Sequence, residues 1–211
     1  AAQGERVASV SFGSGFDRSS QSRFEVDPAN PDDWTSVVES LKVNGGLPNR
    51  IIHVSAVGDP PRRVRRRSAA DLAVHTEVVD QGSLLMMLQA LMMLSQPIEL
   101  FVVTSGACAV GAEPVTQPQR AMLHGAARVV PREATTITTQ VIDIDHVSGE
   151  LGERAIDALM GEIAARATNG VVALRDGRRW VSELQPITLP PAAISPWRHG
   201  GCYLITGGLG G

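Results

Sequence analysis

The sequence has few cysteines, a single lysine and a single tyrosine. Its two cysteines among 211 residues, Cys108 and Cys202, are too few for a disulfide framework and lack the spacing of metal ligands. They favour a reducing compartment, so we expect a cytoplasmic protein without a metal site. Lys42 is the only lysine beside many arginines, a bias typical of GC-rich bacterial genomes that carries no information on function. Tyr203 is the only phenol.

The chain also lacks an excess of charge of either sign and an uninterrupted apolar run. A formal net charge of -3 gives no reason to expect nucleic acid or an anionic membrane as a partner. The beginning of the chain, with Glu5 and Arg6, lacks the apolar core of a signal peptide. Residues 84–103 are the most apolar stretch, but Pro97 and its polar neighbours interrupt it. A helix ending before the proline and then a buried strand are expected there, not a membrane span.

The 43% of hydrophobic residues are arranged in alternating strand and helix patterns. The expected strands are residues 7–12, 50–57, 98–104 and 138–144. The expected helices are residues 32–41, 80–94, 117–130 and 151–167. Repeated strand–helix–strand units of this length require a parallel sheet with helices on both faces, which places the chain in the α/β class.

The pattern changes after the last of these helices. Residues 171–174 and 178–184 flank Asp176-Gly177, a dipeptide that supplies the positive φ angles of a tight β-hairpin. The next stretch, residues 189–196, is rich in proline and lacks the backbone donors of regular structure. We expect a linker there and a new domain from about Gly200.

The final residues have the pattern of a strand that enters a glycine-rich phosphate loop. Clustered glycines let the backbone turn tightly and approach a pyrophosphate at a helix N-terminus. Glycine-rich ends also occur in flexible linkers, so both interpretations stay open. The helix that completes such a loop does not follow, and we therefore expect the chain to be a fragment of a longer protein. The candidate cofactor-binding residues are Thr206, Gly207, Gly208, Leu209, Gly210 and Gly211.

In this order, the segments "IELFVVTSGACAV", "PQRAMLHGAARVVPRE", "TTQVIDID", "VVALRDGRRWVSEL" and "CYLITGGLGG" resemble the ketoreductase region of a modular type I polyketide synthase. The resemblance implies two halves: a structural subdomain with a truncated, cofactor-free Rossmann-like fold related to short-chain reductases, and a catalytic subdomain that binds NADPH. Residues 1–188 would be the structural subdomain, with its C-terminal β-hairpin. Residues 189–199 would be the linker, and residues 200–211 the truncated start of the catalytic subdomain.

The structural half itself lacks the residues of a short-chain reductase. These enzymes need a serine, a tyrosine and a lysine, the last two four residues apart on one helix face, so that the ammonium group favours ionisation of the phenol. Counting back from Glu133 by the usual spacing puts the tyrosine place at Thr116 and the lysine place at Arg120. A threonine hydroxyl is too weak an acid, and a guanidinium presents a fork, not a point charge. We expect no catalytic residue here and core packing for Tyr203.

The first expected strand ends at Gly13-Ser14-Gly15, which could also be taken for a nucleotide loop. Asp17, Arg18 and a polar run follow, where a helix with an apolar face would be needed. A third spaced glycine is absent. A simple turn at the end of the strand is the better interpretation.

Other groups of side chains have structural interpretations beside functional ones. Asp143 and Asp145 share one face of a strand and could bind metal or act as acid and base, but solvation of a strand end explains them more simply. Arg128 and Glu133 are expected to anchor a helix end. An acidic acyl carrier protein or a phosphopantetheine arm could approach a basic stretch, although a solvated loop is the alternative. That stretch comprises Arg62, Arg63, Arg65, Arg66 and Arg67.

Histidines and methionines also have purely structural interpretations. The histidines lack ligand spacing and are expected at the surface or in packing contacts: His53, His75, His124, His146 and His199. The methionines have helical spacing and are expected to fill the core: Met86, Met87, Met92, Met93 and Met122.

Two functions remain open. In the first, which the resemblance implies, the chain braces an NADPH-dependent catalytic half that reduces the β-keto group of a polyketide held on the phosphopantetheine of an acyl carrier protein. In the second, it is a non-catalytic pseudo-ketoreductase that braces neighbouring synthase domains. The intact glycine loop favours the first. NADP(H) is then the cofactor of the complete reductase in secondary metabolite biosynthesis, and none is expected on this fragment. Trp180 is expected to anchor the ribbon against the catalytic half.

Overall fold

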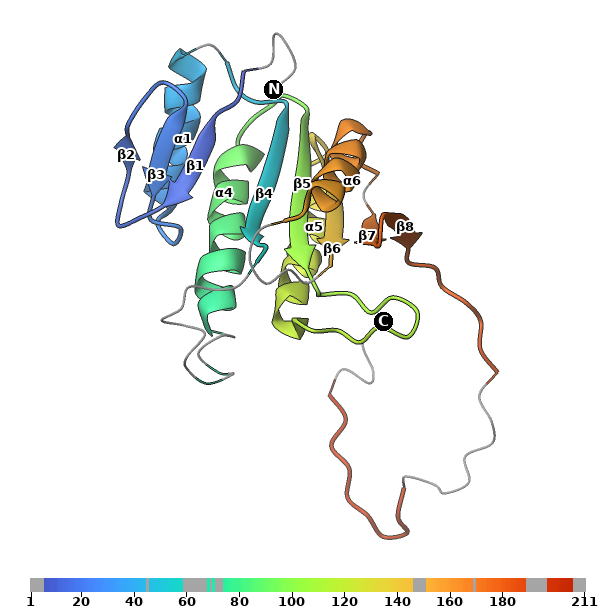
Figure 1. The fold of residues 1–211 in the computed structure, drawn as a ribbon. Helices are drawn as coiled ribbons and strands as arrows, with labels where there is room; N and C mark the ends of the chain where they lie inside the picture. Colours follow the sequence, from blue (N-terminus) through green and yellow to red (C-terminus); the bar gives the residue numbers. More distant parts are fainter. Residues whose placement is uncertain are drawn as a thin grey trace.

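The computed structural model describes residues 6–44, 46–58, 68, 70, 74–145, 151–168, 170–188 and 197–206. Its main feature is a five-stranded sheet in the order β4-β5-β6-β7-β8 (Figure 1). The strands are β4 (Arg50–Ala56), β5 (Ile98–Ser105), β6 (Ile137–Ile144), β7 (Val171–Arg175) and β8 (Arg178–Val181). The first four are parallel, and β8 pairs antiparallel with β7. The predicted α/β class, with a parallel sheet and a C-terminal hairpin, is confirmed.

The hairpin forms at the predicted dipeptide. Asp176 and Gly177 both have positive φ angles, of 48° and 72°, which a two-residue turn between right-twisted strands requires. The second strand is shorter than predicted and ends at Val181. The ladder ends with the pair Val172–Val181, and residues 183 and 184 extend past the start of β7, where no described strand pairs with them.

A second, smaller sheet contains the first predicted strand. It has the order β1-β3-β2, with strands β1 (Ser9–Phe12), β2 (Asp17–Arg18) and β3 (Arg23–Val26). β1 and β3 are parallel, and β2 turns back antiparallel to β3. The polar residues after β1 therefore form a hairpin arm in place of a crossover helix, and β1 joins this small sheet instead of pairing with β4.

In the described part of the chain, four α-helices pack against the sheets, at or near the predicted positions. They are α1 (Pro31–Val43), α4 (Gly82–Met92), α5 (Met122–Glu133) and α6 (Glu153–Ala164). Asn30 caps α1 by accepting a hydrogen bond from the amide of Asp32 at 3.1 Å. A π-helical turn, η1 (Thr76–Gln81), leads into α4, and a 3-10 turn, η2 (Pro118–Ala121), leads into α5.

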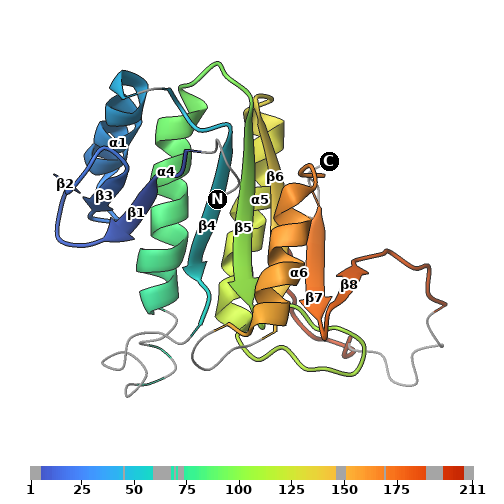
Figure 2. The same cartoon turned by 45° about the horizontal axis from the view of Figure 1, so that its top comes forward.

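The helices are divided unequally between the faces of the main sheet (Figure 2). One core cluster joins the sheet to α1, α4 and α5, and it includes Phe24, Trp34, Leu88, Leu100 and Leu123. The other face carries only α6 among the described helices, with Phe101, Ile142 and Leu159 in its core. No helix in the described part of the chain has the length and hydropathy of a membrane span.

The predicted strand at residues 202–206 is not formed. Residues 197–206 are exposed and belong to no sheet, because the described part of the chain offers no neighbouring strand to pair with them. Tyr203 is half-exposed and contacts Trp197 edge-on, with ring centroids 4.6 Å apart, so the expectation that it packs in the core is wrong for this chain. The predicted basic loop at residues 62–67 and the proline-rich linker at residues 189–196 lie outside the described residues.

Candidate functional site

The carboxyl ends of parallel strands are where α/β sheets bind ligands. In this protein those ends carry an unusual number of buried polar side chains. They are Thr104 and Ser105 of β5, Asp143 of β6, Arg175 of β7 and Arg120 of η2. The contacts of these side chains decide whether the edge of the sheet can hold a substrate or cofactor.

Asp143 lies at the centre of this group and is 0% exposed. One carboxylate oxygen accepts hydrogen bonds from the Thr104 hydroxyl at 2.6 Å and from the Ala107 amide at 3.0 Å. The other accepts from the Cys108 amide at 3.0 Å and from Arg175 at 2.6 Å. Because a carboxylate has about four acceptor positions, Asp143 has none left for a ligand. The prediction of a solvated strand end is wrong for Asp143 and correct for Asp145, which is exposed.

Arg175 compensates the buried charge of Asp143. Its guanidinium also donates to the backbone carbonyls of Asp143 at 2.9 Å and Cys108 at 3.0 Å. Its Nε lies 3.5 Å from carboxylates of both Glu113 and Asp145 at the surface. A buried ion pair is tolerated when its remaining donors and acceptors are satisfied in this way. The pair therefore holds the loop after β5 onto the ends of β6 and β7.

Arg120 occupies the place expected for a catalytic lysine, and it closes the neighbouring strand ends. Its buried guanidinium donates to the backbone carbonyl of Ser105 at 3.1 Å, and it also bonds to the Ser105 hydroxyl and the Gly58 carbonyl. Thr116, at the tyrosine place, precedes η2 and is exposed, with its amide donating to the Gly106 carbonyl at 3.1 Å. The two residues therefore do not share a helix face as a reductase pair must.

One cluster has the composition of a metal site. Ligand atoms of Cys108, His124 and Asp143 lie within 4.8 Å of one another. Burial first, and then the charge of Asp143, raises the pKa of the Cys108 thiol to about 11, so it stays protonated at neutral pH. Thr104 gives its one hydroxyl proton to Asp143, and His124 Nε2 therefore donates to Thr104 at 3.1 Å. A protonated thiol and a saturated carboxylate do not fit a metal ion.

The N-terminal glycine turn also disfavours a phosphate. The Gly13 amide donates to the Val26 carbonyl at 2.8 Å, and the side chain of Glu25 fills the space beside the Gly13 α-carbon. A carboxylate here repels an anion, as expected for a simple turn.

The remaining predicted residues fall into four groups. Among the candidate cofactor residues, Thr206 is exposed, and Gly207 to Gly211 lie outside the described residues. His53 is buried and bonds to the Ser83 hydroxyl at 3.0 Å, and burial lowers its pKa to about 4. Met87 fills the core, whereas Met93 and Met122 are exposed at helix ends, so the core prediction is wrong for these two. Arg128 and Glu133 are also exposed.

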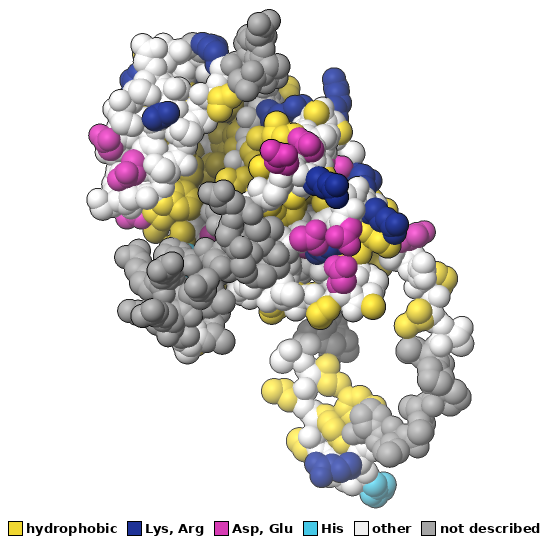
Figure 3. Space-filling model, viewed as in Figure 1, with side chains coloured by type: hydrophobic (Ala, Val, Ile, Leu, Met, Phe, Trp, Pro, Cys, Tyr) yellow, Lys and Arg dark blue, Asp and Glu magenta, His cyan; other side chains and the backbone are white. Residues whose placement is uncertain are grey.

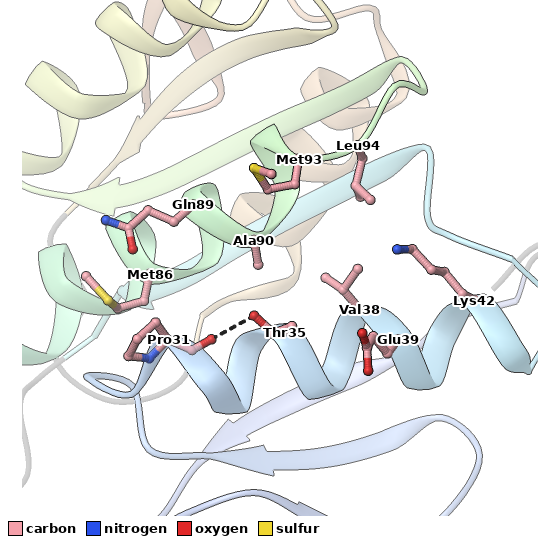
Figure 4. Close-up of a pocket in the computed structure, with 10 residues that line it drawn as sticks. All are labelled: Pro31, Thr35, Val38, Glu39, Lys42, Met86, Gln89, Ala90, Met93 and Leu94. Atoms are coloured by element: carbon pink, nitrogen blue, oxygen red, sulfur yellow. Dashed lines mark hydrogen bonds between the residues drawn. The ribbon is translucent and has the colours of Figure 1, made fainter.

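A pocket of about 300 Å³ lies between α1 and α4, away from the strand ends (Figure 4). Val38, Ala90 and Leu94 contribute apolar walls, and Glu39 and Lys42 are its only charged lining residues. It lacks the convergent buried polar groups of a ligand site.

A family model described as beta-ketoacyl synthase-like, N-terminal, matches residues 1–164. The chain belongs to this family. It is 31% identical over 117 residues to a phenolphthiocerol/phthiocerol polyketide synthase of Mycobacterium tuberculosis (strain CDC 1551 / Oshkosh), covering 53% of this chain and 6% of that protein. It is 29% identical over 187 residues to erythronolide synthase EryA3 of Saccharopolyspora erythraea, covering 89% and 6%. The chain thus spans about 6% of the length of these curated relatives.

Solved structures identify the fold. A multidomain structure with adenylation, ketoreductase and pseudo Asub parts, from a keto acid-selecting NRPS module, matches with a TM-score of 0.79 and 20% identity, over 89% of this chain and 15% of that one. An N-terminal ketoreductase from a macrolactin assembly line matches with a TM-score of 0.59 and 15% identity, over 84% and 35%. The Rossmann-like fold is confirmed, and the resemblance to the ketoreductase region of a type I polyketide synthase is confirmed with it.

The sequence alone could not identify the buried network at the strand ends. Asp143 and Arg175 are 32 residues apart, and only the adjacent β6 and β7 bring them together. The available signal was weak: each stands near the end of an apolar strand, a position where buried charge needs a partner.

Proposed function

We propose that this chain is the structural half of a polyketide synthase β-ketoacyl reductase and braces an NADPH-dependent catalytic half. The observation that carries the proposal is that buried side chains fill the carboxyl ends of the parallel strands. Arg120 stands at the place expected for the catalytic lysine of a short-chain reductase. Its hydrogen bonds, like those of the neighbouring Asp143–Arg175 pair, are directed into the protein. A reductase fold with this edge filled can support a neighbour but has no room for the chemistry.

The exposed apolar residues beyond β7 support a bracing role. Trp180 is 43% exposed, and Leu184 is 99% exposed. Tyr203, Leu204 and Ile205 add apolar surface immediately before the glycine loop. Such a concentration at one end of a chain is typical of a surface that another domain covers. The first partner is therefore the catalytic subdomain, which would be joined to it through the linker.

Cofactor and substrate belong to that second half. A gluconate 5-dehydrogenase from Burkholderia cenocepacia in complex with NADP and tartrate shares the fold, with a TM-score of 0.55, and NADP(H) fits the proposed reductase. Thr206 and the glycines after it would hold the pyrophosphate, whereas the strand ends of this half do not fit the cofactor. The substrate would be a β-ketoacyl chain on the phosphopantetheine of an acyl carrier protein, with adjacent synthase domains as further partners.

Removing the structural half from the complete reductase tests the proposal. We compare the complete two-half protein with its catalytic half alone, measuring NADPH-dependent reduction of a diketide thioester and the midpoint of thermal unfolding. The complete protein should reduce the thioester, and the catalytic half alone should lose both activity and stability. If the complete protein folds but has no activity, the chain belongs to a pseudo-ketoreductase scaffold instead. A catalytic half that is equally stable and active alone would contradict the bracing role.

A further inference from the structure

Among the described residues, only α6 covers one face of the main sheet. α6 contacts β6 and β7, and Phe101 and Val103 of β5 are buried with it. β4 lies two strands from β6, about 10 Å away at the usual strand spacing. Packed helices also lie 8–10 Å apart, so the space beside α6 over β4 is about one helix wide. We call this space the lane. No described helix occupies that space.

The floor of this open lane is apolar at Ile52 and Val54, next to the ion pair of Arg50 with Glu99. His53 of β4 contacts Ser83 on α4 at 3.0 Å, and successive strand side chains point to opposite faces, so its direct neighbours Ile52 and Val54 point to the α6 side. The register with β5 shifts only after His53, before Ala56. Ile52 also pairs with Phe101, which belongs to the α6 core. Ile52 and Val54 are 42% and 52% exposed. Parallel sheets normally have both faces covered, so a bare pair of β-branched residues here requires an explanation.

One wall of the lane is apolar as well. Leu159 and Ile163 of α6 face the sheet, and Glu162 pairs with Arg179 of β8 at 2.8 Å. At about 100° per residue, Ile156 and Met160 lie on the other side of Leu159 from Glu162, toward β4. They are 43% and 55% exposed. Figure 3 shows hydrophobic side chains gathered in the hollow between the small sheet and the part of the molecule around α6.

The rim of the lane carries two carboxylates beside Met160, with the exposed Arg154 beyond them on α6. Glu153 and Asp157 are exposed on α6, next to Met160 on the solvent side, and neither has an ion-pair partner among the described residues. Arg50, a cation at the floor, is paired with Glu99 at 2.7 Å. A helix that fills the lane thus meets apolar side chains on the floor and wall and two carboxylates at the rim.

We infer that this lane, floored by Ile52 and Val54 and walled by Ile156 and Met160, is a docking surface for an amphipathic α-helix from outside this chain, with its apolar stripe flanked by basic residues. We infer a helix because the width of the lane equals that of one helix. The carboxylates of Glu153 and Asp157 favour basic residues beside the apolar stripe of that helix. The surface lies at the edge of the sheet opposite the hairpin, so it goes beyond the proposed bracing of a catalytic half and does not depend on it.

The test uses the whole chain and two synthetic helical peptides of about 18 residues, long enough to be partly helical in water. Both carry the same leucine stripe, flanked by lysines in one and by glutamates in the other. Fluorescence anisotropy should show saturable binding of the lysine peptide and at least tenfold weaker binding of the glutamate peptide. Met160→Gln combined with Val54→Thr should weaken binding of the lysine peptide about tenfold.

Matched substitutions on the opposite face are the control. Met122→Gln combined with Val129→Thr changes the same residue types at similarly exposed positions of α5 and should leave binding within about twofold. Glu153→Gln with Asp157→Asn should remove the preference for the lysine peptide. Equal loss in the control pair, or no loss in the lane pair with unchanged melting temperature, overturns the inference. Sedimentation that shows a dimer broken only by the lane pair also overturns it, because a second copy would then be the occupant.

Discussion

The carboxyl ends of β5 to β7 and the segment beyond β8 are two regions of one chain with opposite character. In the first, charged groups are buried, and Asp143 uses all its acceptor positions within the protein. In the second, apolar groups such as Leu184 and Leu204 are exposed. The buried charges of the first region are all satisfied within the protein, whereas the described apolar side chains of the second region pack into no core. The difference fits the proposed structural half of a reductase, whose strand ends are filled and whose exposed end would contact the catalytic half.

The largest loss of stability should come from removing Asp143 from its buried network at the strand ends. Asp143→Ala leaves the Arg175 guanidinium buried beside only two surface carboxylates 3.5 Å away. Removal of one partner of a buried pair costs about 3–5 kcal/mol. Urea unfolding should show this loss, while Asp145→Ala at the exposed carboxylate should change stability by less than about 0.5 kcal/mol. Equal effects of the two substitutions would show that the buried pair does not hold the sheet edge.

Trp180 tests the second region in two contexts. It is 43% exposed in this chain, so Trp180→Ala should cost the isolated chain about 1 kcal/mol. In the complete two-half reductase the cost should rise to about 3–5 kcal/mol if the catalytic half buries the indole. Thermal unfolding of both proteins measures the difference, and the KM for NADPH should be unchanged in the surviving enzyme. A complete reductase that melts at the wild-type temperature would remove Trp180 from the brace.

Acid should destabilise the protein through His53, which is buried between β4 and α4. Burial lowers the pKa of His53 to about 4, below its ordinary value of 6.5, so the unfolded chain binds more protons between these values. The contribution is complete above about pH 6.5 and is lost progressively as the pH falls to about 4, by about 3 kcal/mol in total. Burial also lowers the pKa of His124, which acts in the same direction. His53→Gln should flatten the pH dependence of urea unfolding in this window. A variant with the wild-type slope would contradict the assignment.

Restoring the reductase residues should produce no activity. Thr116→Tyr with Arg120→Lys supplies a phenol and an amine, but the phenol stands in the loop before η2, and a lysine cannot reach both Ser105 and Gly58 as the Arg120 fork does. Loss of those bonds should cost about 1–2 kcal/mol. Turnover of a diketide thioester by the double variant would show that this half is more than a frame.

The smallest effect should be that of NADPH on this chain. Its strand ends are filled, because the hydrogen bonds of Arg120 and of the Asp143–Arg175 pair are directed into the protein. A fluorescence titration should show no saturable binding tighter than about 100 μM. Tighter binding would mean that these strand ends open to a nucleotide.

Residue patterns were sufficient for the regular elements because those depend on local periodicity and turn chemistry. The strand–helix alternation from Arg50 to Ala164 and the hairpin at Asp176-Gly177 were predicted from such patterns and are confirmed. The separate sheet around β1 and the coil at residues 202–206 were not predicted. Pairing of a strand depends on which other strands are available, and this is not encoded in the strand itself.

The sequence by itself determined the α/β class, the absence of the tyrosine–lysine pair at Thr116 and Arg120, and the ketoreductase resemblance, because each depends on residue identity and spacing along the chain. Only the tertiary structure decided which polar residues are buried and which are exposed. Asp143 and Asp145 look equivalent on one strand face, yet one is buried against Arg175 and the other is exposed. Burial depends on the loop that folds over the end of β6, and such long-range packing cannot be inferred from neighbours in sequence.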